Sequence, residues 1–327
     1  MTASVASSGR PQISHPALKN STECQQSEQN APASATKAGH AGQVGGSAKS
    51  TTIAAARLGR AISSMPPLSR GASPRTSATV TSEPFDRATR RRRFQRAATI
   101  GDSFLLNRMF DDVAERLEAL ARPIERLLVV GPQQPGWRER LTALAPAIDW
   151  LDPGNAEEDR ATFTPATYDA ALAVGSLDSV NQLPLALRAL ALALRPNAPL
   201  FGAMLGGHSL PLLRRALIEA DRATGSAAAR SHPRIDAATL ATLLGAAGFS
   251  EPVVDIDRIT LRYADLPSLV ADLRAAAATN MLADRSRIVP GKAWANRLAA
   301  AFAAPADPDG RVAETLEIIH FHGWGRG

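Results

Sequence analysis

The feature that most constrains the fold is a regular alternation of short apolar runs with helical stretches, which begins at residue 126. The run "RLLVVG" is continuously apolar and closes on Gly131, which is typical of a strand buried on both faces. Three further strands are predicted at "AIDWLD", "YDAALAV" and "APLFGAML", with helical stretches at "WRERLTALAP" and "LPLALRALALALRP". Strands that alternate with helices of this length predict parallel βαβ units and an open sheet covered on both faces.

The second half of the chain extends this pattern. Helices are predicted at "LPLLRRALIEAD" and "DAATLATLLGAAGF", in two stretches between Leu266 and Ala304, and before the first strand at "GDSFLLNRMFDDVAERLEALARP". Strands are predicted at "PVVDIDRITLRY" and "AETLEIIHFHGW", and two strands so late in the chain favour an antiparallel edge. The predicted fold class is therefore α/β, with a mostly parallel sheet, an antiparallel edge and flanking helices.

Composition divides the 327 residues into two parts. The first 84 residues contain no Phe, Trp or Tyr and are rich in Ala, Ser, Thr, Gly and Pro, so they cannot bury enough apolar surface to offset the entropy of ordering. We expect residues 1–84 to be a disordered low-complexity tail and residues 85–327 to form one domain. The tail also resembles an organelle transit peptide, but an Ala/Arg-rich extension, or a true start further downstream such as Met65, explains it more simply.

Net charge follows the same division. The chain carries +6, but residues 1–84 contribute +5, residues 85–98 contribute +5, and residues 99–327 carry −4. The positive charge belongs to the tail and an arginine run, so we expect no specific nucleic acid partner for the folded domain.

Cysteine content and hydropathy indicate the compartment. The lone cysteine, Cys24, permits no intrachain disulfide and no cysteine zinc site, which fits a reducing cytoplasm. The longest uncharged stretch of the folded part, residues 196–213, contains Pro and Gly pairs and does not read as a membrane span. We therefore expect a cytoplasmic protein without a transmembrane segment.

Ligands of open parallel sheets bind at the carboxyl ends of the strands. The loop after the first strand, "GPQQPGW", keeps Gly131 and Gly136, which would let the backbone approach a nucleotide-type cofactor, but its two prolines lack N–H donors. An ordinary strand-to-helix turn explains it equally well. Asp152 follows Gly131 by 21 residues, the spacing of a ribose-binding acid, with Asp149 as a competitor. An Asp before Pro-Gly is also a common turn former.

Two further loops offer cofactor contacts. Asp159, or its neighbour Glu158, is placed where a side chain could contact an adenine ring. Ser176 and Asp178 follow the next strand end. Ser176 joins Gly131, Gly136, Asp152 and Asp159 as the predicted cofactor-binding set.

His208 is the candidate catalytic residue. It follows Gly206 and Gly207 at a predicted strand end, and an imidazole titrates near neutral pH, as a general base must. A histidine at the start of a helix beside the N-cap candidate Ser209 is the simpler alternative. The remaining histidines of the domain are scattered, and we predict neither a catalytic triad nor a metal site from them.

The segment "FDRATRRRRFQRAA" contains the arginine run Arg90 to Arg93. Such a run grips phosphate, acidic lipid or an acidic partner, or more often lies solvated beside a domain. Phe85 and Phe94 indicate that the segment docks onto the fold.

From this segment to the "GW" near the end, the chain resembles the methyltransferase-like family of respiratory complex I assembly factors. More distantly, it is similar to the malonyl-carrier-protein methyltransferase of biotin synthesis. The most specific stretches are "LRPNAPLFGAMLGGHSLPLLR", "LLGAAGFSEPVVDIDRITLRY" and "DGRVAETLEIIHFHGW". The resemblance implies a class I methyltransferase fold, S-adenosylmethionine (SAM) as cofactor and a complex I subunit as partner. It also implies methyl transfer, or the arginine modification attributed to relatives.

Two departures from the family pattern bear on activity. Val130 stands where an acidic residue before Gly-x-Gly would hold the amino group of SAM, and Gly131-Pro132-Gln133 stands in place of Gly-x-Gly. The family pattern His-Trp-Val-Asn-Asp is replaced by residues 178–182, "DSVNQ". Two hypotheses remain: a SAM-dependent methyltransferase that modifies a protein subunit, and an inactive assembly or binding module that has lost SAM binding.

Overall fold

A computed structural model of the chain describes residues 83–120 and 122–326, so the predicted tail, except for its last two residues, lies outside the described residues. The elements are, in order, α1 (Arg87–Ile100), α2 (Phe104–Glu118), β1 (Arg126–Val130), α3 (Trp137–Thr142), β2 (Ala147–Leu151), η1 (Glu158–Arg160), β3 (Ala170–Val174), η2 (Leu177–Ser179), α4 (Leu183–Ala193), β4 (Pro199–Leu205), α5 (Pro211–Ala223), α6 (Ala237–Ala247), β5 (Phe249–Tyr263), α7 (Leu266–Ala275), α8 (Lys292–Ala303) and β6 (Val312–Gly325).

The six strands form one sheet in the order β2-β1-β3-β4-β6-β5. Strands β2, β1, β3 and β4 are parallel, whereas β6 runs antiparallel to both β4 and β5. The prediction of a mostly parallel sheet with an antiparallel edge is confirmed. The strand order changes direction between β1 and β3, which is the place where ligands of such sheets bind.

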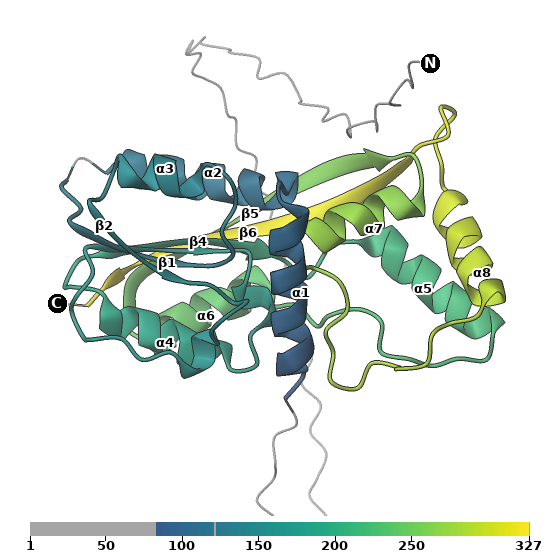
Figure 1. Ribbon diagram of the computed structural model, residues 1–327, viewed down its shortest axis with the longest axis horizontal. Coiled ribbons are helices and arrows are strands. Elements are labelled where there is room, and N and C mark those ends of the chain that lie inside the picture. Colours follow the sequence, from purple (N-terminus) through teal and green to yellow (C-terminus); the bar gives the residue numbers. More distant parts are fainter. Residues whose placement is uncertain (1–82, 121, 327) are drawn as a thin grey trace, which may run out of the picture. The chain divides into compact units, whose positions relative to one another are not determined.

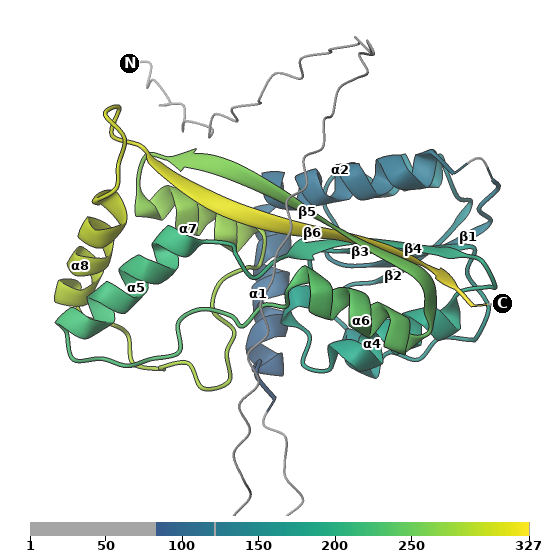
Figure 2. The same ribbon diagram turned by 180° about the vertical axis from the view of Figure 1, so that it is seen from behind.

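Helices cover both faces of the sheet, as Figures 1 and 2 show: α2 and α3 lie over one face, and α4 and α6 over the other. The alternation within β1 explains this arrangement, since successive side chains of a strand point to opposite faces. Leu127 and Val129 belong to the core beneath α2 and α3, and Leu128 and Val130 to the core beneath α4 and α6. All four are buried, which is why the strand reads as a continuous apolar run.

Strands β5 and β6 are much longer than the rest and extend beyond β4 (Figure 1). Their far halves carry α5, α7 and α8, which pack on the same core as α2. Phe302 of α8 and Leu269 of α7 meet Val312 of β6 and Tyr263 of β5 in this region. The far halves of β5 and β6 therefore continue past the carboxyl end of β4, where Leu205 pairs with Ile318.

Helix α1 crosses the direction of the strands (Figures 1 and 2). It begins at Asp86, whose side chain accepts a hydrogen bond from the Thr89 N–H, and ends at Gly101. Phe85 and Phe94 are both 3% exposed, so the arginine-rich segment docks onto the fold as predicted. Its helical form was not predicted, although arginine is a good helix former.

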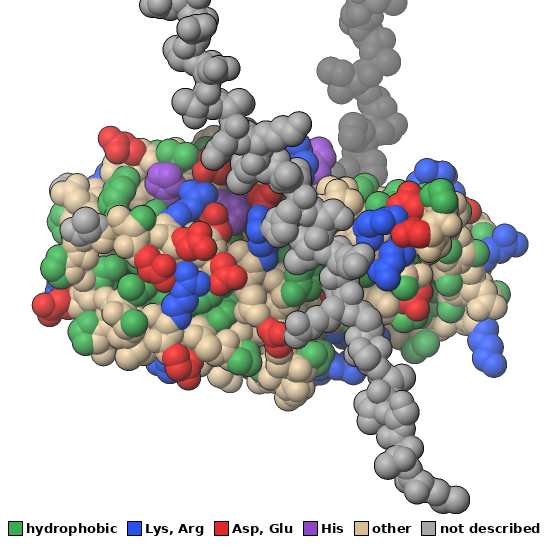
Figure 3. Space-filling view, turned by 90° about the horizontal axis from the view of Figure 1, so that it is seen from above, with side chains coloured by type: hydrophobic (Ala, Val, Ile, Leu, Met, Phe, Trp, Pro, Cys, Tyr) green, Lys and Arg blue, Asp and Glu red, His purple; other side chains and the backbone are tan. Residues whose placement is uncertain are grey.

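Charges of both signs are interleaved over α2 and β5, as Figure 3 shows from above. Arg108 pairs with Asp257 at 2.9 Å, and Arg116 pairs with Asp112 at 2.9 Å and with Asp255 at 3.3 Å. No helix within residues 83–120 and 122–326 is long and apolar enough to cross a membrane.

Candidate functional site

Gly131 ties the ends of three strands together. Its φ is +145°, and a Cβ there would lie 2.3 Å from the Val174 carbonyl oxygen, so only glycine fits between β1 and β3. Its N–H donates to the Leu151 carbonyl at 3.1 Å, and its carbonyl accepts from Trp150 Nε1 at 2.8 Å. These groups are engaged within the protein. At Gly136, with φ +80°, a Cβ would meet nothing within 4 Å, so the loop is open there.

Side chains fasten the rest of the loop to α2. The buried side chain of Gln134 accepts a hydrogen bond from the Ser103 N–H at 2.9 Å. Trp137 stacks on Phe110 with ring centroids 4.2 Å apart and donates through Nε1 to Asn107 Oδ1 at 2.7 Å. These side-chain contacts hold the loop against α2, and the two prolines of the loop supply no N–H donor for a ligand.

Asp152 forms a turn. Its Oδ1 accepts from the Gly154 N–H at 2.7 Å, and its carbonyl accepts from the N–H groups of Asn155 and Ala156. The carbonyl of Gly154 accepts in turn from Gln95 Nε2 of α1 at 2.8 Å. The turn-forming alternative thus describes the contacts that Asp152 makes in the structure.

Asp159 is held by an arginine of α1. Arg87 donates from Nη1 and Nη2 to the two carboxylate oxygens of Asp159, both at 2.8 Å, and also binds Glu83 and Glu157. Burial opposes the charge of Asp159, but the hydrogen bonds and charge of Arg87 keep its pKa below the ordinary value. The carboxylate also accepts from the Gln182 N–H at 3.1 Å, so it is engaged on both oxygens.

A second arginine of α1 is buried at the end of β3. Arg90 Nη2 donates to Glu158 Oε1 at 2.8 Å and to the Ser176 carbonyl at 2.9 Å, and Nε donates to Ser179 Oγ at 3.1 Å. The Arg90 and Glu158 side chains are 6% and 3% exposed. We call Glu158, Ser176 and Ser179 the Arg90 socket. The hydroxyl of Ser176 is buried there without a hydrogen-bond partner.

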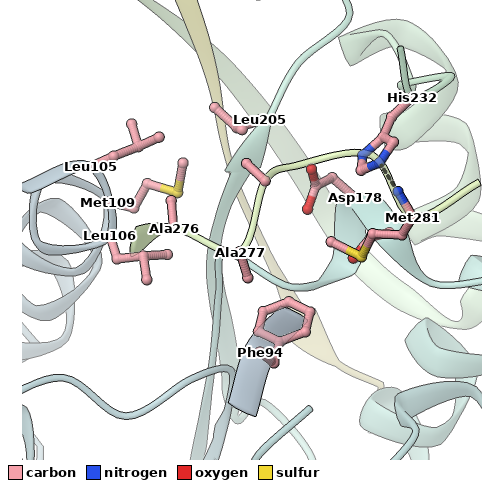
Figure 4. A pocket seen from close by; sticks show the side chains of 13 residues that line it. Phe94, Leu105, Leu106, Met109, Asp178, Leu205, His232, Ala276, Ala277 and Met281 are labelled. Atoms are coloured by element: carbon pink, nitrogen blue, oxygen red, sulfur yellow. Dashed lines mark hydrogen bonds between the residues drawn. The ribbon is translucent and has the colours of Figure 1, made fainter. Parts of the chain in front are cut away.

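Next to this socket lies a buried pair, of which the sequence analysis named Asp178 but not its partner Arg234. Asp178 Oδ2 is 3.7 Å from Arg234 Nε, and both side chains are buried. Burial raises the pKa of Asp178 despite the nearby Arg234. His232 lies close by (Figure 4), where its Nε2 accepts from the Met281 N–H at 2.9 Å. Burial and the charge of Arg234 lower the pKa of His232 to about 3, so its ring is neutral at physiological pH.

His208 lies apart from these groups. Its side chain is exposed, and its N–H donates to Glu317 Oε1 at 3.2 Å. Ser209 is buried and exchanges hydrogen bonds with the backbone of Glu317. The structure therefore gathers Asp159 and Ser176 beneath α1, but it shows no contact between His208 and either of them. Within the described ranges, no group of three or more His, Cys, Asp or Glu residues is placed to hold a metal ion.

Little space remains at this edge of the sheet. One cavity of about 10 Å³ is lined by Phe94, Leu106, Gly175, Asp178 and His232 (Figure 4), and another of about 10 Å³ lies beside Arg87. Each has room for about one water molecule. Of the two carboxylates predicted to bind SAM, Asp159 is engaged by Arg87 of α1 and Asp152 by its own turn, and Val130 supplies no carboxylate. SAM does not fit this edge of the sheet while α1 is docked.

Comparison with known proteins identifies relatives of two kinds, although no family model matches the chain. The arginine-hydroxylase NDUFAF5, mitochondrial, of Danio rerio is 28% identical over 267 residues, which cover 73% of this chain and 82% of that protein. The Homo sapiens protein of the same name is 31% identical over 171 residues, or 52% and 49% of the two chains. The malonyl-[acyl-carrier protein] O-methyltransferase of Laribacter hongkongensis is 33% identical over 162 residues, or 47% and 52%. The match thus spans about half the length of the last two relatives.

Solved structures also resemble the chain. The YcgJ protein of Bacillus subtilis aligns with a TM-score of 0.45 and 9% identity, over 66% of this chain and 99% of that one. The phosphoethanolamine N-methyltransferase 2 of Haemonchus contortus, solved with SAM, aligns with a TM-score of 0.42 and 11% identity, over 77% and 59%. By sequence, the chain is similar to the NDUFAF5 arginine-hydroxylases and to the malonyl-[acyl-carrier protein] O-methyltransferases, which confirms the predicted resemblance.

Proposed function

We propose that this chain is a methyltransferase-like protein of respiratory complex I assembly that receives an arginine side chain of a protein subunit at the carboxyl edge of its sheet. It would act in the cytoplasm, peripheral to the inner membrane through that partner. One observation carries the proposal: this edge is already built to hold a guanidinium group, that of Arg90.

The chemistry of the Arg90 socket matches arginine better than lysine. A guanidinium presents five N–H donors in a planar fork, whereas an ammonium is a compact charge with three. In the socket, one carboxylate and one carbonyl accept from Nη2, and one hydroxyl accepts from Nε. Four relatives named arginine-hydroxylase support the same ligand class.

SAM-dependent methyl transfer is the second candidate. Two features favour it: the open side of Gly136, and the buried Ser176 hydroxyl that has no partner in the described structure. The relatives named O-methyltransferase favour it too. Titration calorimetry separates the two, since a competent site would bind SAM near 1 μM, or roughly −8 kcal/mol. We expect no binding heat and no thermal shift at millimolar SAM, and micromolar binding would restore the enzyme hypothesis.

Retention of complex I subunits tests the main proposal. The tagged full chain, purified from its own cells, should enrich complex I subunits by mass spectrometry. Glu158→Gln should lose them, because the socket loses its charge, whereas Glu219→Gln, on the exposed face of α5, should keep them. Far-ultraviolet circular dichroism would check that both variants fold. If the wild-type chain enriches no complex I subunit above an unrelated tagged protein, the proposed function is wrong.

A further inference from the structure

We infer that α1 is an internal ligand of the site that it covers: Arg90 occupies the place of the partner's arginine, and the site becomes available only when α1 undocks. This regulation rests on the proposed function, because it concerns the same socket. It goes further because it says that a helix of the chain itself blocks the socket until it undocks.

The position of α1 supports this closed form. The helix contacts each of the loops that follow β2 and β3: Gln95 reaches the Gly154 carbonyl, Arg87 reaches Asp159, and Arg90 reaches the Ser176 carbonyl. The carboxyl ends of these strands flank the point where strand order changes direction. A ligand could not enter this edge while α1 remains docked, since the cavities left beside it hold about one water molecule each.

Helix α1 also packs outside the two main cores. Phe85, Phe94 and Ala97 form a separate small cluster with Ala277, Met281 and Leu282. Neither core that covers the sheet includes a residue of α1. Undocking α1 would therefore break this cluster and the arginine contacts, but it would leave the sheet and its covering helices intact.

Docking of α1 carries a built-in electrostatic cost as well. Arg93 lies on the same helix, and its Nε is buried without a hydrogen-bond partner. Burial, and then the charges of Arg96 and Arg285, lower the pKa of Arg93. No ion pair involves Arg93 anywhere in residues 83–120 and 122–326. Of Arg96 and Arg285, only Arg285 lies outside α1, and it also binds Asp86 Oδ2 at 3.0 Å. The favourable docking contacts of α1 are thus opposed by the repulsion between Arg93 and Arg285.

These opposed contacts suggest two variants with opposite effects. Arg90→Ala removes the buried anchor and should favour the open form. Arg93→Glu replaces the repelled charge with one that attracts Arg285, which lies outside α1, and it should favour the closed form. Arg91→Ala is the control on the same helix, because Arg91 is 49% exposed and lies 3.5 Å from Glu157.

Hydrogen exchange reports α1 directly. We expect the amides of residues 90–100 to exchange at least tenfold faster in Arg90→Ala and several-fold slower in Arg93→Glu, while α2 stays unchanged. Arg91→Ala should resemble the wild type. If Arg90→Ala leaves the exchange of α1 unchanged, the inference is overturned.

A peptide with the sequence of residues 84–98 serves as the binding probe, because its contacts are those of α1. If the open form makes up about 1% of the wild-type chain, its apparent affinity is about 100-fold below that of an open chain. Arg90→Ala should therefore bind the labelled peptide at least tenfold more tightly than wild type, by fluorescence anisotropy. A peptide with lysine at the position of Arg90, or with a scrambled sequence, should bind at least tenfold more weakly than the original.

A covalent lock completes the test. A Cβ at Gly154 would lie 3.4 Å from Gln95 Cγ and 3.5 Å from the Gln95 nitrogen, so Gln95→Cys with Gly154→Cys, in a Cys24→Ser background, brings two thiols within bonding reach. The oxidised chain should lose peptide binding, and reduction should restore it.

The outcomes separate the two proposals. Equal binding by the oxidised and reduced chains would refute the internal-ligand inference and leave the proposed function standing. Binding to Arg90→Ala that depends on the peptide arginine, without complex I subunits in the purification, would refute the proposed function instead. If Arg90→Ala opens α1 but binds no peptide, the socket is no arginine site and both proposals fall.

Discussion

The buried pair of Asp178 and Arg234 allows a quantitative prediction. Both side chains are buried, yet Asp178 Oδ2 and Arg234 Nε are 3.7 Å apart, and Arg234 Nε has no hydrogen-bond partner. Attraction at this distance recovers only part of the desolvation cost, and the raised pKa of Asp178 has this cause. Arg234→Met should therefore cost about 3 to 5 kcal/mol in the free energy of unfolding at pH 7.5, since it leaves the carboxylate buried without its cation.

The cost should depend on pH in a direction that the structure fixes. The folded-state pKa of Asp178 lies above its unfolded value, and losing Arg234 raises it further. The unfolded state then releases a proton that the folded state keeps, so stability falls as pH rises from the unfolded pKa toward the folded one. Arg234→Met should lose up to about 1.4 kcal/mol per pH unit across that window. It should regain most of its stability at pH 5.

Urea unfolding at pH 5, 6, 7 and 8 measures this effect, provided the slope against urea is unchanged. The double variant Asp178→Leu with Arg234→Met is the matched control, because replacing both charges by apolar groups is often neutral or stabilising. An Arg234→Met deficit that is equal at pH 5 and pH 8, or a double variant as unstable as the single one, would refute the reasoning.

Three further predictions concern packing and titration. A Cβ at Gly202 would lie 2.1 Å from Phe321 Cζ, so Gly202→Ala should lower the free energy of unfolding by about 1 to 3 kcal/mol, whereas Gly245→Ala, on α6 with open space around it, should raise it by up to about 1 kcal/mol. Thermal unfolding compares the two variants, and equal effects would contradict the packing argument. Burial and Arg234 hold the pKa of His232 at about 3, so below pH 6.5 the folded state binds fewer protons than the unfolded state and loses stability as the pH falls. His232→Gln should reduce this loss, by at most about 1.4 kcal/mol per pH unit. An unchanged dependence of stability on pH in urea unfolding would count against it. Trp137→Phe should keep the stack on the α2 ring but lose the indole hydrogen bond, at about 0.5 to 1.5 kcal/mol by the same assay, and a loss near zero would show that this bond contributes nothing.

The sheet was predictable because its strands obey local rules. The run at β1 is apolar at every position that the sheet buries, and β4 closes on Gly206 where the chain must turn. The late strand β5 was also predictable, since its more buried and more exposed residues alternate, whereas β6 is buried at most positions between β4 and β5. Pattern and fold agree wherever burial alone decides the residue type.

The site was less predictable, because its contacts join residues far apart in the chain. Arg90 meets Glu158 and Ser176, 68 and 86 residues away, and no local period encodes such a pairing. One signal was present: three successive carboxylates at residues 157–159 complement the arginine run. For Asp152 the local sequence was ambiguous: its spacing from Gly131 suited a ribose contact, and its position before Pro-Gly suited a turn.

The place of β6 in the sheet has a consequence for folding. Strand β6 lies between β4 and β5, although it follows both in the chain. Until Val312 and the residues after it have been synthesised, β4 is an unpaired edge strand of the sheet. Strand β5 then has no neighbour, since β6 is its sole partner in the described structure. Unpaired strand edges invite association with other chains. The newly made protein therefore passes through a stage with unpaired strand edges, which only the insertion of β6 removes. Variants that slow the insertion of β6 should aggregate even when their folded state is stable.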